Sequence, residues 1–330
     1  MESDELETAT AAPFESGIRT ADEAAAFLRT RIGPEIGEVT KLGQGAWSTA
    51  YAFQHDAHEY IARFGKHVDD FERDRIAASH ATPDLPIPKV IEIGEAAGAY
   101  YAVSERAFGG FIDHLDGPQM RALLPSLFAG LDAVRKADLS GTTGYGGWGA
   151  DGNGMSASWR DELLGVAIDR PEFRGHGWRE KMVESTVEAG MFDEAFAHLS
   201  VLAERAPTDR HLIHGDLLNF NVLVADGRLS AVFDWGCSRH GDFLYDIAWF
   251  AFWAPWYPAW EGIDFAQEAL RHYAEIGLAV PNFEDRMRCC QIHIGLDNQA
   301  YCASIGRWDQ FEETGRRTLA VVRGEDFKRT

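Results

Sequence analysis

The stretch that decides the fold is HLIHGDLLNFNVLV, residues 211–224. Its ends, HLI and NVLV, are typical of two short buried strands. Between them the chain places His214, Asp216 and Asn221. Burying polar side chains costs free energy unless they have partners or a chemical task. The stretch therefore predicts a functional loop between two strands.

A second segment, LSAVFDWGCSRHGDFLYDIAWF at 229–250, carries the next candidate. Its β-rich start leads Asp234 into a Trp-Gly turn. The dipeptide Asp226-Gly227 lies between the two segments and is typical of a tight hairpin turn. The sequence therefore predicts one β region at 211–233.

Composition limits the classes of partner. The 330 residues carry a formal net charge of −21, and 45% of them are hydrophobic. This charge disfavours nucleic acid and anionic membranes and suits a small cationic ligand. No run reaches the roughly 18 apolar residues of a membrane span, and the acidic start lacks the features of a signal peptide. The four cysteines form no C-x-x-C pair, so we expect a cytoplasmic monomer with reduced thiols.

Hydrophobic patterns predict two lobes after a flexible acidic tail at 1–18. In the first lobe, 19–105, a helix at 20–33 precedes five β-type runs, with a helix-like segment at 68–81 between the third and fourth. The second lobe, 106–330, is mainly helical. Its predicted helices lie near 117–137, 158–169, 178–205, 242–254, 262–277, 283–304 and 307–322.

Two segments are rich in glycine. In KLGQGAWSTAYAF, Gly43 and Gly45 lie in a strand–turn–strand pattern, with Ser48 where a third glycine often falls. Neither a Rossmann turn, which opens a helix, nor a Gly-Lys-Ser/Thr P-loop fits. The alternatives are a hairpin whose backbone approaches phosphates and a structural hairpin. The seven glycines of 141–154 indicate either a flexible loop or a mobile lip over a site.

The order of the polar groups indicates phosphoryl transfer. Arg63 lies on the third predicted strand, and Glu72 and Asp74 lie on the following helix. Transfer from ATP requires a glycine flap, a cation held by an acid, a carboxylate at the acceptor hydroxyl, and ligands for Mg²⁺. Taken alone, Arg63 could equally be a surface arginine.

The loop residues supply the remaining parts. The five-residue interval lets Asp216 face the acceptor while Asn221 turns back toward the metal. Asn221 and Asp234 offer the hard oxygen ligands that Mg²⁺ requires. We expect His214 to hydrogen-bond the loop backbone rather than act as a base, and Asp234 alone could also be a turn cap.

With these motifs the chain resembles the aminoglycoside phosphotransferase family of small-molecule kinases. The hallmark is HGD, four residues, N, a hairpin, DW, and then GD before a helix. Segments at 85–95, 137–146, 158–161, 252–256 and 294–299 further resemble the hygromycin-phosphorylating branch of that family. The likeness covers nearly the whole chain after the tail.

The resemblance implies an α+β, bilobal, protein-kinase-like fold with an antiparallel N-lobe sheet and a mainly helical C-lobe. It favours Asp74 over Glu72 as the acid that holds Arg63, a position where Lys is frequent in the family. Backbone groups near Ser104 and Arg106 would meet adenine. The family's Asp242 and Asp246 positions would brace the catalytic loop.

On the acceptor side, the resemblance implies that Trp253 and Trp256 line the antibiotic site as flat apolar walls. The alternative is core packing, which we expect for Trp249. Asp297 is a weaker candidate to bind a substrate ammonium group, because an aspartate in a helix is usually solvated or capping.

We therefore predict ATP- and Mg²⁺-dependent phosphorylation of a hydroxyl on a hygromycin-B-like aminoglycoside, which confers resistance. GTP is an alternative donor. Another small cationic or sugar acceptor, and a non-catalytic nucleotide-binding sensor, are the alternative functions.

Overall fold

The computed structural model of the chain describes residues 17–185, 187, 190–327 and 329. Most of the expected tail, 1–18, lies outside these residues. Ile18 is buried in the core of the part that follows. No helix among the described residues is both long and apolar enough to cross a membrane.

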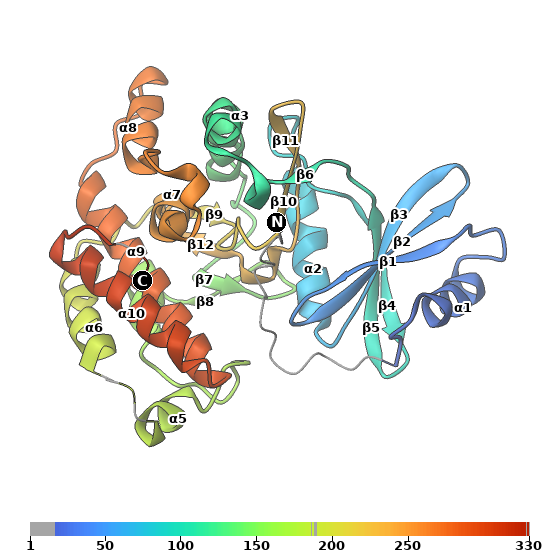
Figure 1. Cartoon of the computed structure of the whole chain (residues 1–330), viewed down its shortest axis with the longest axis horizontal. Coiled ribbons are helices and arrows are strands. Elements are labelled where there is room, and N and C mark those ends of the chain that lie inside the picture. The colour runs from blue at the N-terminus through green and yellow to red at the C-terminus, as the bar shows by residue number, and fades with distance from the viewer. Residues whose placement is uncertain (1–16, 186, 188–189, 328, 330) are drawn as a thin grey trace, which may run out of the picture. The chain divides into compact units, whose positions relative to one another are not determined.

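The chain divides into two compact units (Figure 1). The N-terminal unit holds the described residues up to Ser79 together with Pro88–Ala107. The C-terminal unit holds His80–Ile87 and the described residues from Phe108 onward. The short segment His80–Ile87 thus interrupts the N-terminal unit along the sequence.

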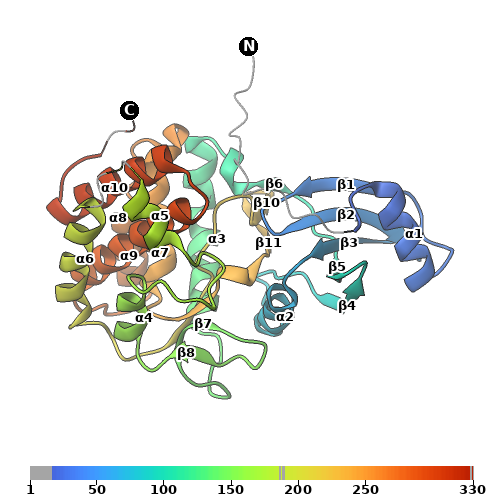
Figure 2. The ribbon, with the colours of Figure 1, turned by 90° about the horizontal axis from the view of Figure 1, so that it is seen from below.

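The N-terminal unit is one five-stranded antiparallel sheet with two helices (Figure 2). Its strand order is β1-β2-β3-β5-β4. A capping box at Thr20 and Glu23 starts α1, whose buried face joins the sheet's aromatic core. The elements are α1 (Ala21–Arg31), β1 (Val39–Gln44), β2 (Ser48–His55), β3 (His58–Gly65), α2 (Val68–Ala77), β4 (Val90–Ala96) and β5 (Ala99–Glu105).

The C-terminal unit is mainly helical, as predicted, and α9 lies at its centre with contacts to α5, α6, α7 and α10 (Figure 1). Its helices are α3 (Gly117–Arg135), α4 (Trp159–Gly165), α5 (Trp178–Glu184), α6 (Gly190–Ala203), α7 (Leu244–Trp253), α8 (Phe265–Glu275), α9 (Phe283–Ser304) and α10 (Trp308–Arg323). Together the two units confirm the predicted fold class.

Two small antiparallel sheets carry the loops of interest, in the orders β11-β10-β6 and β8-β7-β12-β9. The predicted hairpin at Asp226-Gly227 is confirmed, with φ values of 51° and 71°. The strands are β6 (Gly110–Phe111), β7 (Tyr145–Trp148), β8 (Gly154–Ser156), β9 (His211–Ile213), β10 (Val222–Ala225), β11 (Arg228–Val232) and β12 (Arg239–Gly241).

The glycine-rich segment 141–154 is strand in five of its fourteen residues, 145–148 and 154, and turn or irregular loop in the other nine. It forms β7 and β8, and β7 pairs with β12. At Gly144 (φ 71°) a Cβ atom would lie 2.1 Å from the carbonyl oxygen of Gly154, so only glycine fits there. The close approach of the two strands explains part of this glycine content.

The single helix predicted at 178–205 is wrong, because the chain forms α5 and α6 as separate helices. Ser185 ends α5 in an extended conformation, with φ −78° and ψ 168°. The periodic apolar pattern continues across this break, which is why the sequence suggested one helix.

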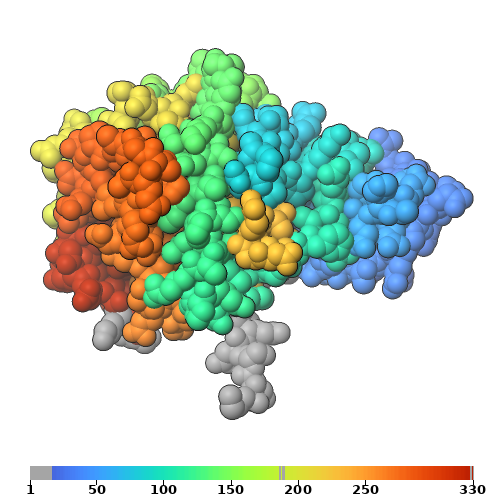
Figure 3. Space-filling model, turned by 90° about the horizontal axis from the view of Figure 1, so that it is seen from above, coloured from blue at the N-terminus to red at the C-terminus, as the bar shows by residue number. Residues whose placement is uncertain are grey.

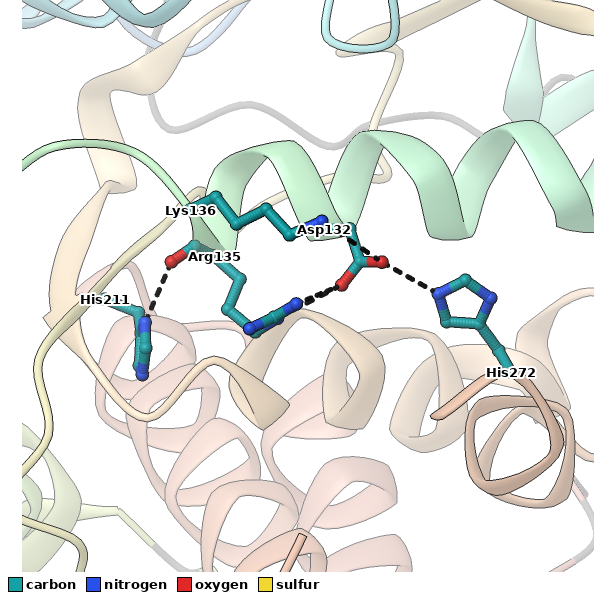
Figure 4. Close-up of polar contacts among 5 residues, drawn as sticks. All are labelled: Asp132, Arg135, Lys136, His211 and His272. Atoms are coloured by element: carbon teal, nitrogen blue, oxygen red, sulfur yellow. Dashed lines mark hydrogen bonds and ion pairs between the residues drawn. The ribbon is translucent and has the colours of Figure 1, made fainter. Parts of the chain in front are cut away.

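A polar cluster joins α3, α8 and β9 in the C-terminal unit (Figure 4). The Asp132 carboxylate accepts hydrogen bonds from Arg135, at 2.9 and 3.1 Å, and from His272, at 3.0 Å. His211 Nδ1 donates to the Arg135 carbonyl oxygen at 2.9 Å. Figure 3 shows α3 and α8 beside one another on one face of this unit. The cluster thereby fixes the start of the strand that leads into the HGD loop.

Candidate active site

The HGD loop begins with a buried, neutral histidine. His214 is fully buried; its Nε2 donates to the Phe233 carbonyl oxygen at 3.0 Å, and its Nδ1 accepts from the Asp216 N–H at 3.2 Å. Burial lowers the pKa of His214 to about 4. The imidazole therefore shapes the backbone, as the sequence indicated, and is not placed as a base.

Asp246 braces the same loop from α7. Its carboxylate accepts the N–H groups of His214, at 3.0 Å, and Gly215, at 2.9 Å. Burial raises the pKa of Asp246 to about 6, although these hydrogen bonds oppose the rise. Asp242 was expected to brace the loop too, but it instead binds Arg286 of α9, at 2.6 and 2.8 Å.

Asp216 is held by two carboxamides. Asn219 Nδ2 donates to Oδ1 at 2.7 Å, and Asn221 Nδ2 donates to Oδ2 at 3.1 Å and to the Asp216 carbonyl oxygen at 2.8 Å. Desolvation of the partly buried carboxylate raises the pKa of Asp216 to about 7, and the charges of Asp234 and Asp113 add to the rise. A carboxylate with a pKa near neutrality is well suited to accept a proton from a hydroxyl.

Three residues around Asp216 have left-handed backbones without being glycine. Asn219, Phe220 and Asp234 have φ values of 61°, 65° and 62°. Such conformations cost free energy and concentrate at functional sites. Asp234 accepts no capping hydrogen bond from the turn Trp235–Cys237 that it precedes, so the turn-cap alternative does not account for it.

Asn221 and Asp234 suit Mg²⁺. Because the Asn221 nitrogen is used by Asp216, its carboxamide oxygen is the atom left for a ligand. Among the described residues no three His, Cys, Asp or Glu side chains are grouped to hold a metal. Two hard oxygens fit Mg²⁺, which typically takes one or two protein ligands and completes its octahedron with phosphates and water.

In the N-terminal unit, the cation of β3 pairs with an acid of α2. Arg63 binds Asp74, whose side chain is 7% exposed, and Glu72 binds Arg75 instead. The Arg63 guanidinium also lies 5.2 Å from the centroid of the Phe71 ring. Of the two acids that the sequence offered, Asp74 is therefore the one that holds Arg63.

The glycine-rich hairpin joins β1 to β2, and its register shifts between Lys41 and Gly43. The Gly45 N–H donates to the Ser48 carbonyl oxygen at 2.9 Å. A Cβ atom at Gly43 would meet no described atom within 4 Å, and neither Gly43 nor Gly45 has a positive φ. The fold of this unit therefore does not require glycine at either position. A ligand that approaches the backbone closely would require glycine at these positions.

Ser104 and Arg106 were expected near adenine. Ser104 lies inside β5, where it is paired with Ile61 on one side and Val90 on the other. The Arg106 N–H donates to the Glu59 carbonyl oxygen at 3.0 Å, and its guanidinium binds the Glu59 carboxylate at 2.6 Å. That N–H group serves the sheet rather than a nucleotide.

The candidate acceptor wall is a chain of ring contacts at the end of α7. Trp253 lies 4.9 Å from Trp256 and 5.9 Å from Trp249, measured between ring centroids. Trp256 stacks on Phe252, at 6.3 Å, and on Phe327, at 5.6 Å. All three tryptophans are half-buried, including Trp249, which was expected in the core.

Asp297 is committed to a cation of its own chain. Its carboxylate binds Arg239 at 2.5 Å, and Arg239 also lies 3.5 Å from Glu162 and over the Tyr245 ring. The pKa of the Asp297 carboxyl is lowered by Arg239 against the effect of burial. A substrate ammonium group would have to compete with this ion pair.

The comparisons with known proteins show the family. The model of the phosphotransferase enzyme family matches residues 38–283. The chain belongs to that family. It is 32% identical over 306 residues to hygromycin-B 4-O-kinase of Escherichia coli, covering 92% of this chain and 86% of that protein.

Solved structures of phosphotransferases are similar to this chain over most of its length. A thermostable mutant of aminoglycoside phosphotransferase APH(4)-Ia, in a ternary complex with AMP-PNP and hygromycin B, matches with a TM-score of 0.79 and 31% identity, covering 91% of this chain and 97% of that one. Spectinomycin phosphotransferase APH(9)-Ia, in complex with ADP and spectinomycin, shares the fold alone, with a TM-score of 0.58 and 12% identity over 92% and 99% of the two chains.

Sequence reasoning missed three residues of this candidate site. Asp113 and Tyr257 meet the loop from segments far away along the chain, and no local pattern marks either of them. Asn219 lies inside the quoted stretch, between Asp216 and Asn221. Its polar side chain, between two buried leucines and a half-buried Phe220, was the available signal.

Proposed function

We propose that the chain transfers the γ-phosphoryl group of ATP to a hydroxyl of a hygromycin-B-like aminoglycoside. The observation that carries the proposal is the Asp216 carboxylate, fixed by Asn219 and Asn221 at hydrogen-bond distance. The similarity to hygromycin-B 4-O-kinase over 92% of the chain supports this acceptor. The N-terminal unit would bind the nucleotide and the C-terminal unit the acceptor.

In this proposal the side chains of the protein position the acceptor hydroxyl and neutralise the charge of the phosphates. Asp216 orients the acceptor hydroxyl and takes its proton as the hydroxyl oxygen bonds to the γ-phosphorus and the bond to the leaving ADP oxygen breaks. Asn221 and Asp234 would hold Mg²⁺, which supplies positive charge to the phosphates. Arg63 would bind phosphate oxygens, and its planar guanidinium can do so bidentately.

The acceptor assignment rests on charge and shape. A net charge of −21 favours a polycationic ligand. Trp253 and Trp256 would form an apolar wall for sugar rings, and Asp297 stays with Arg239. Phosphate added to such a drug places negative charge and bulk on a molecule that depends on its ammonium groups, which inactivates it. We further propose a cytoplasmic monomer, a compartment that suits the four free thiols.

The test is a rate of ADP release from purified protein with Mg²⁺-ATP, measured with and without hygromycin B. The proposal expects strong stimulation by the drug and a phosphomonoester signal in the ³¹P spectrum of the product. Stimulation only by another aminoglycoside or amino alcohol would identify a different acceptor. Nucleotide binding without turnover for any acceptor would indicate a sensor. Repeating the assay with GTP determines the donor.

A further inference from the structure

Asp113 lies in the short turn Ile112–His114 and reaches the catalytic loop from 106 residues away. Its Oδ1 accepts the N–H of Asn219 at 2.9 Å, and its Oδ2 accepts the N–H of Phe220 at 3.0 Å. Successive N–H groups that converge on one anion form a nest, and such charge-assisted hydrogen bonds are the strong ones. The carboxylate therefore acts as the anion of a nest made by the loop.

The two residues in this nest need support. Asn219 and Phe220 are consecutive, and both have positive φ. Asparagine tolerates the left-handed region, but a bulky residue such as phenylalanine is rarely found there. The edge-to-face contact of Phe220 with Phe111, at 5.3 Å, fixes its ring but not its backbone. Asp113 is the group that binds both N–H groups.

A negative charge at position 113 is electrostatically unfavourable, so we expect a carboxylate there only if its hydrogen bonds stabilise the loop. Among the described residues, this carboxylate is bound by Asn219, Phe220 and Tyr257, none of which is a cation. Its charge adds to those of Asp216 and Asp234, and it would also repel the phosphates of a nucleotide. An asparagine or serine would have avoided this repulsion.

The same carboxylate also holds the acceptor side. The Tyr257 hydroxyl donates to Asp113 Oδ1 at 2.8 Å. The Tyr257 ring stacks on Trp260 at 4.1 Å, and the Trp260 indole donates to the Leu115 carbonyl oxygen at 2.8 Å. Asp113 thus connects the catalytic loop to the residue that directly follows Trp256.

We propose that Asp113 is a positioning residue for phosphoryl transfer. Its nest holds Asn219 and Phe220 in the left-handed conformation that brings the carboxamides of Asn219 and Asn221 to Asp216. Loss of the carboxylate frees this backbone, so the two carboxamides no longer fix Asp216. The kinetic part of this inference rests on the proposed function, whereas the conformational part does not.

The experiment compares Asp113→Ala and Asp113→Asn in the full-length protein. Hydrogen exchange of the loop amides and steady-state kinetics with ATP and hygromycin B are measured for each. Asp113→Ala should speed exchange at Asn219 and Phe220 by about tenfold, the effect of one lost hydrogen bond. It should lower kcat on the order of 10²-fold, since small misplacements of reacting groups have effects of that size, with the KM for ATP within twofold. Asp113→Asn keeps one oxygen, so its exchange rates and its kcat should lie between those of the wild type and those of Asp113→Ala.

Asp116→Ala is the matched control. Asp116 lies three residues later and caps α3 through the Gln119 N–H at 2.8 Å, without touching the loop. This variant loses helix stability but should keep the loop exchange and kcat of the wild type. Unchanged loop exchange in Asp113→Ala, or a kcat within twofold of Asp116→Ala, would overturn the proposal.

Failure of the proposed function and failure of the positioning role of Asp113 give different results. If the wild type phosphorylates no acceptor, the proposed function is wrong, and the exchange comparison alone decides the role of Asp113 in the loop. If the wild type is active and Asp113→Ala matches it, only the positioning role is wrong.

Discussion

The catalytic loop and the aromatic segment at 249–260 lie in the same unit but are held by different forces. In the loop, directional hydrogen bonds fix Asp216, His214 and the two backbone N–H groups bound by Asp246. In the aromatic segment, ring contacts dominate, and of its aromatic side chains Tyr257 and Trp260 each donate one hydrogen bond. Within the described residues, the buried indole N–H groups of Trp249 and Trp253 have no hydrogen-bond partner.

This difference determines how readily each region can be interpreted. A hydrogen-bonded loop needs particular residue types at particular spacings, because donors and acceptors must meet within a few tenths of an ångström. Apolar contact is non-directional, so one tryptophan can serve equally as core or as ligand wall. Residue type and spacing therefore indicate a function for the loop, whereas they leave two interpretations open for the aromatic segment. Experiments on the aromatic segment are the most informative.

The largest expected effect is at the centre of the loop. Asp216→Asn keeps the shape of the side chain but removes the proton acceptor, so kcat should fall by roughly 10²–10⁴-fold. Nucleotide binding, followed by calorimetry with a non-hydrolysable ATP analogue, should stay near the wild-type value. Retention of more than about a tenth of the wild-type kcat would contradict the catalytic assignment.

The next effect concerns the metal. Asp234→Ala removes a charged ligand, so the Mg²⁺ concentration needed for half-maximal rate should rise at least about 10²-fold, because even groups behind the ligands commonly contribute 10–100-fold. Asn221→Ala removes a neutral oxygen and should raise this Mg²⁺ concentration less. A Mg²⁺ titration of initial rate measures both. The same apparent affinity in both variants as in the wild type would show that neither residue is a ligand.

The sequence predicted the elements of the N-terminal sheet because alternating apolar residues and turn dipeptides define strands locally. It singled out Asp216, Asn221 and Asp234 as candidates because phosphoryl transfer restricts residue type and spacing. It could not predict Asp113 or the engagement of Asp297 by Arg239, since both depend on contacts between distant segments. The hairpin at β7 and β8 was missed because its glycines, needed for close strand approach, resemble those of a flexible loop.

A smaller effect tests the aromatic segment. If Trp253 and Trp256 form the acceptor wall, Ala at either position should raise the KM for hygromycin B about thirtyfold, equivalent to about 2 kcal/mol, without changing the KM for ATP. If they are core residues, the variants should instead lose about 3–5 kcal/mol of stability. Melting temperatures measured beside both KM values separate the outcomes. Trp178→Ala is a control, because Trp178 is only 5% exposed and packs on Phe192 in the core.

The smallest expected effect concerns His240, which combines both kinds of contact. Its ring stacks on Trp148 at 5.7 Å, and its Nδ1 lies 3.4 Å from an Arg210 nitrogen. It lies in β12, opposite Leu212 of the strand that enters the catalytic loop. Burial, reinforced by the charge of Arg210, lowers the pKa of His240 to about 4.

Because the unfolded chain binds this proton near pH 6.5 and the folded chain does not, the contribution of His240 to stability is complete above about pH 6.5 and is lost toward pH 4, at about 1.4 kcal/mol per pH unit. His240→Gln removes this titration and leaves the other buried histidines unchanged. Urea unfolding at pH 7.5 and pH 5.5 should therefore show a wild-type loss that exceeds the variant's by about 1.4 kcal/mol. Equal losses would mean that His240 is already protonated in the folded protein at pH 5.5, and that burial and the charge of Arg210 do not lower its pKa.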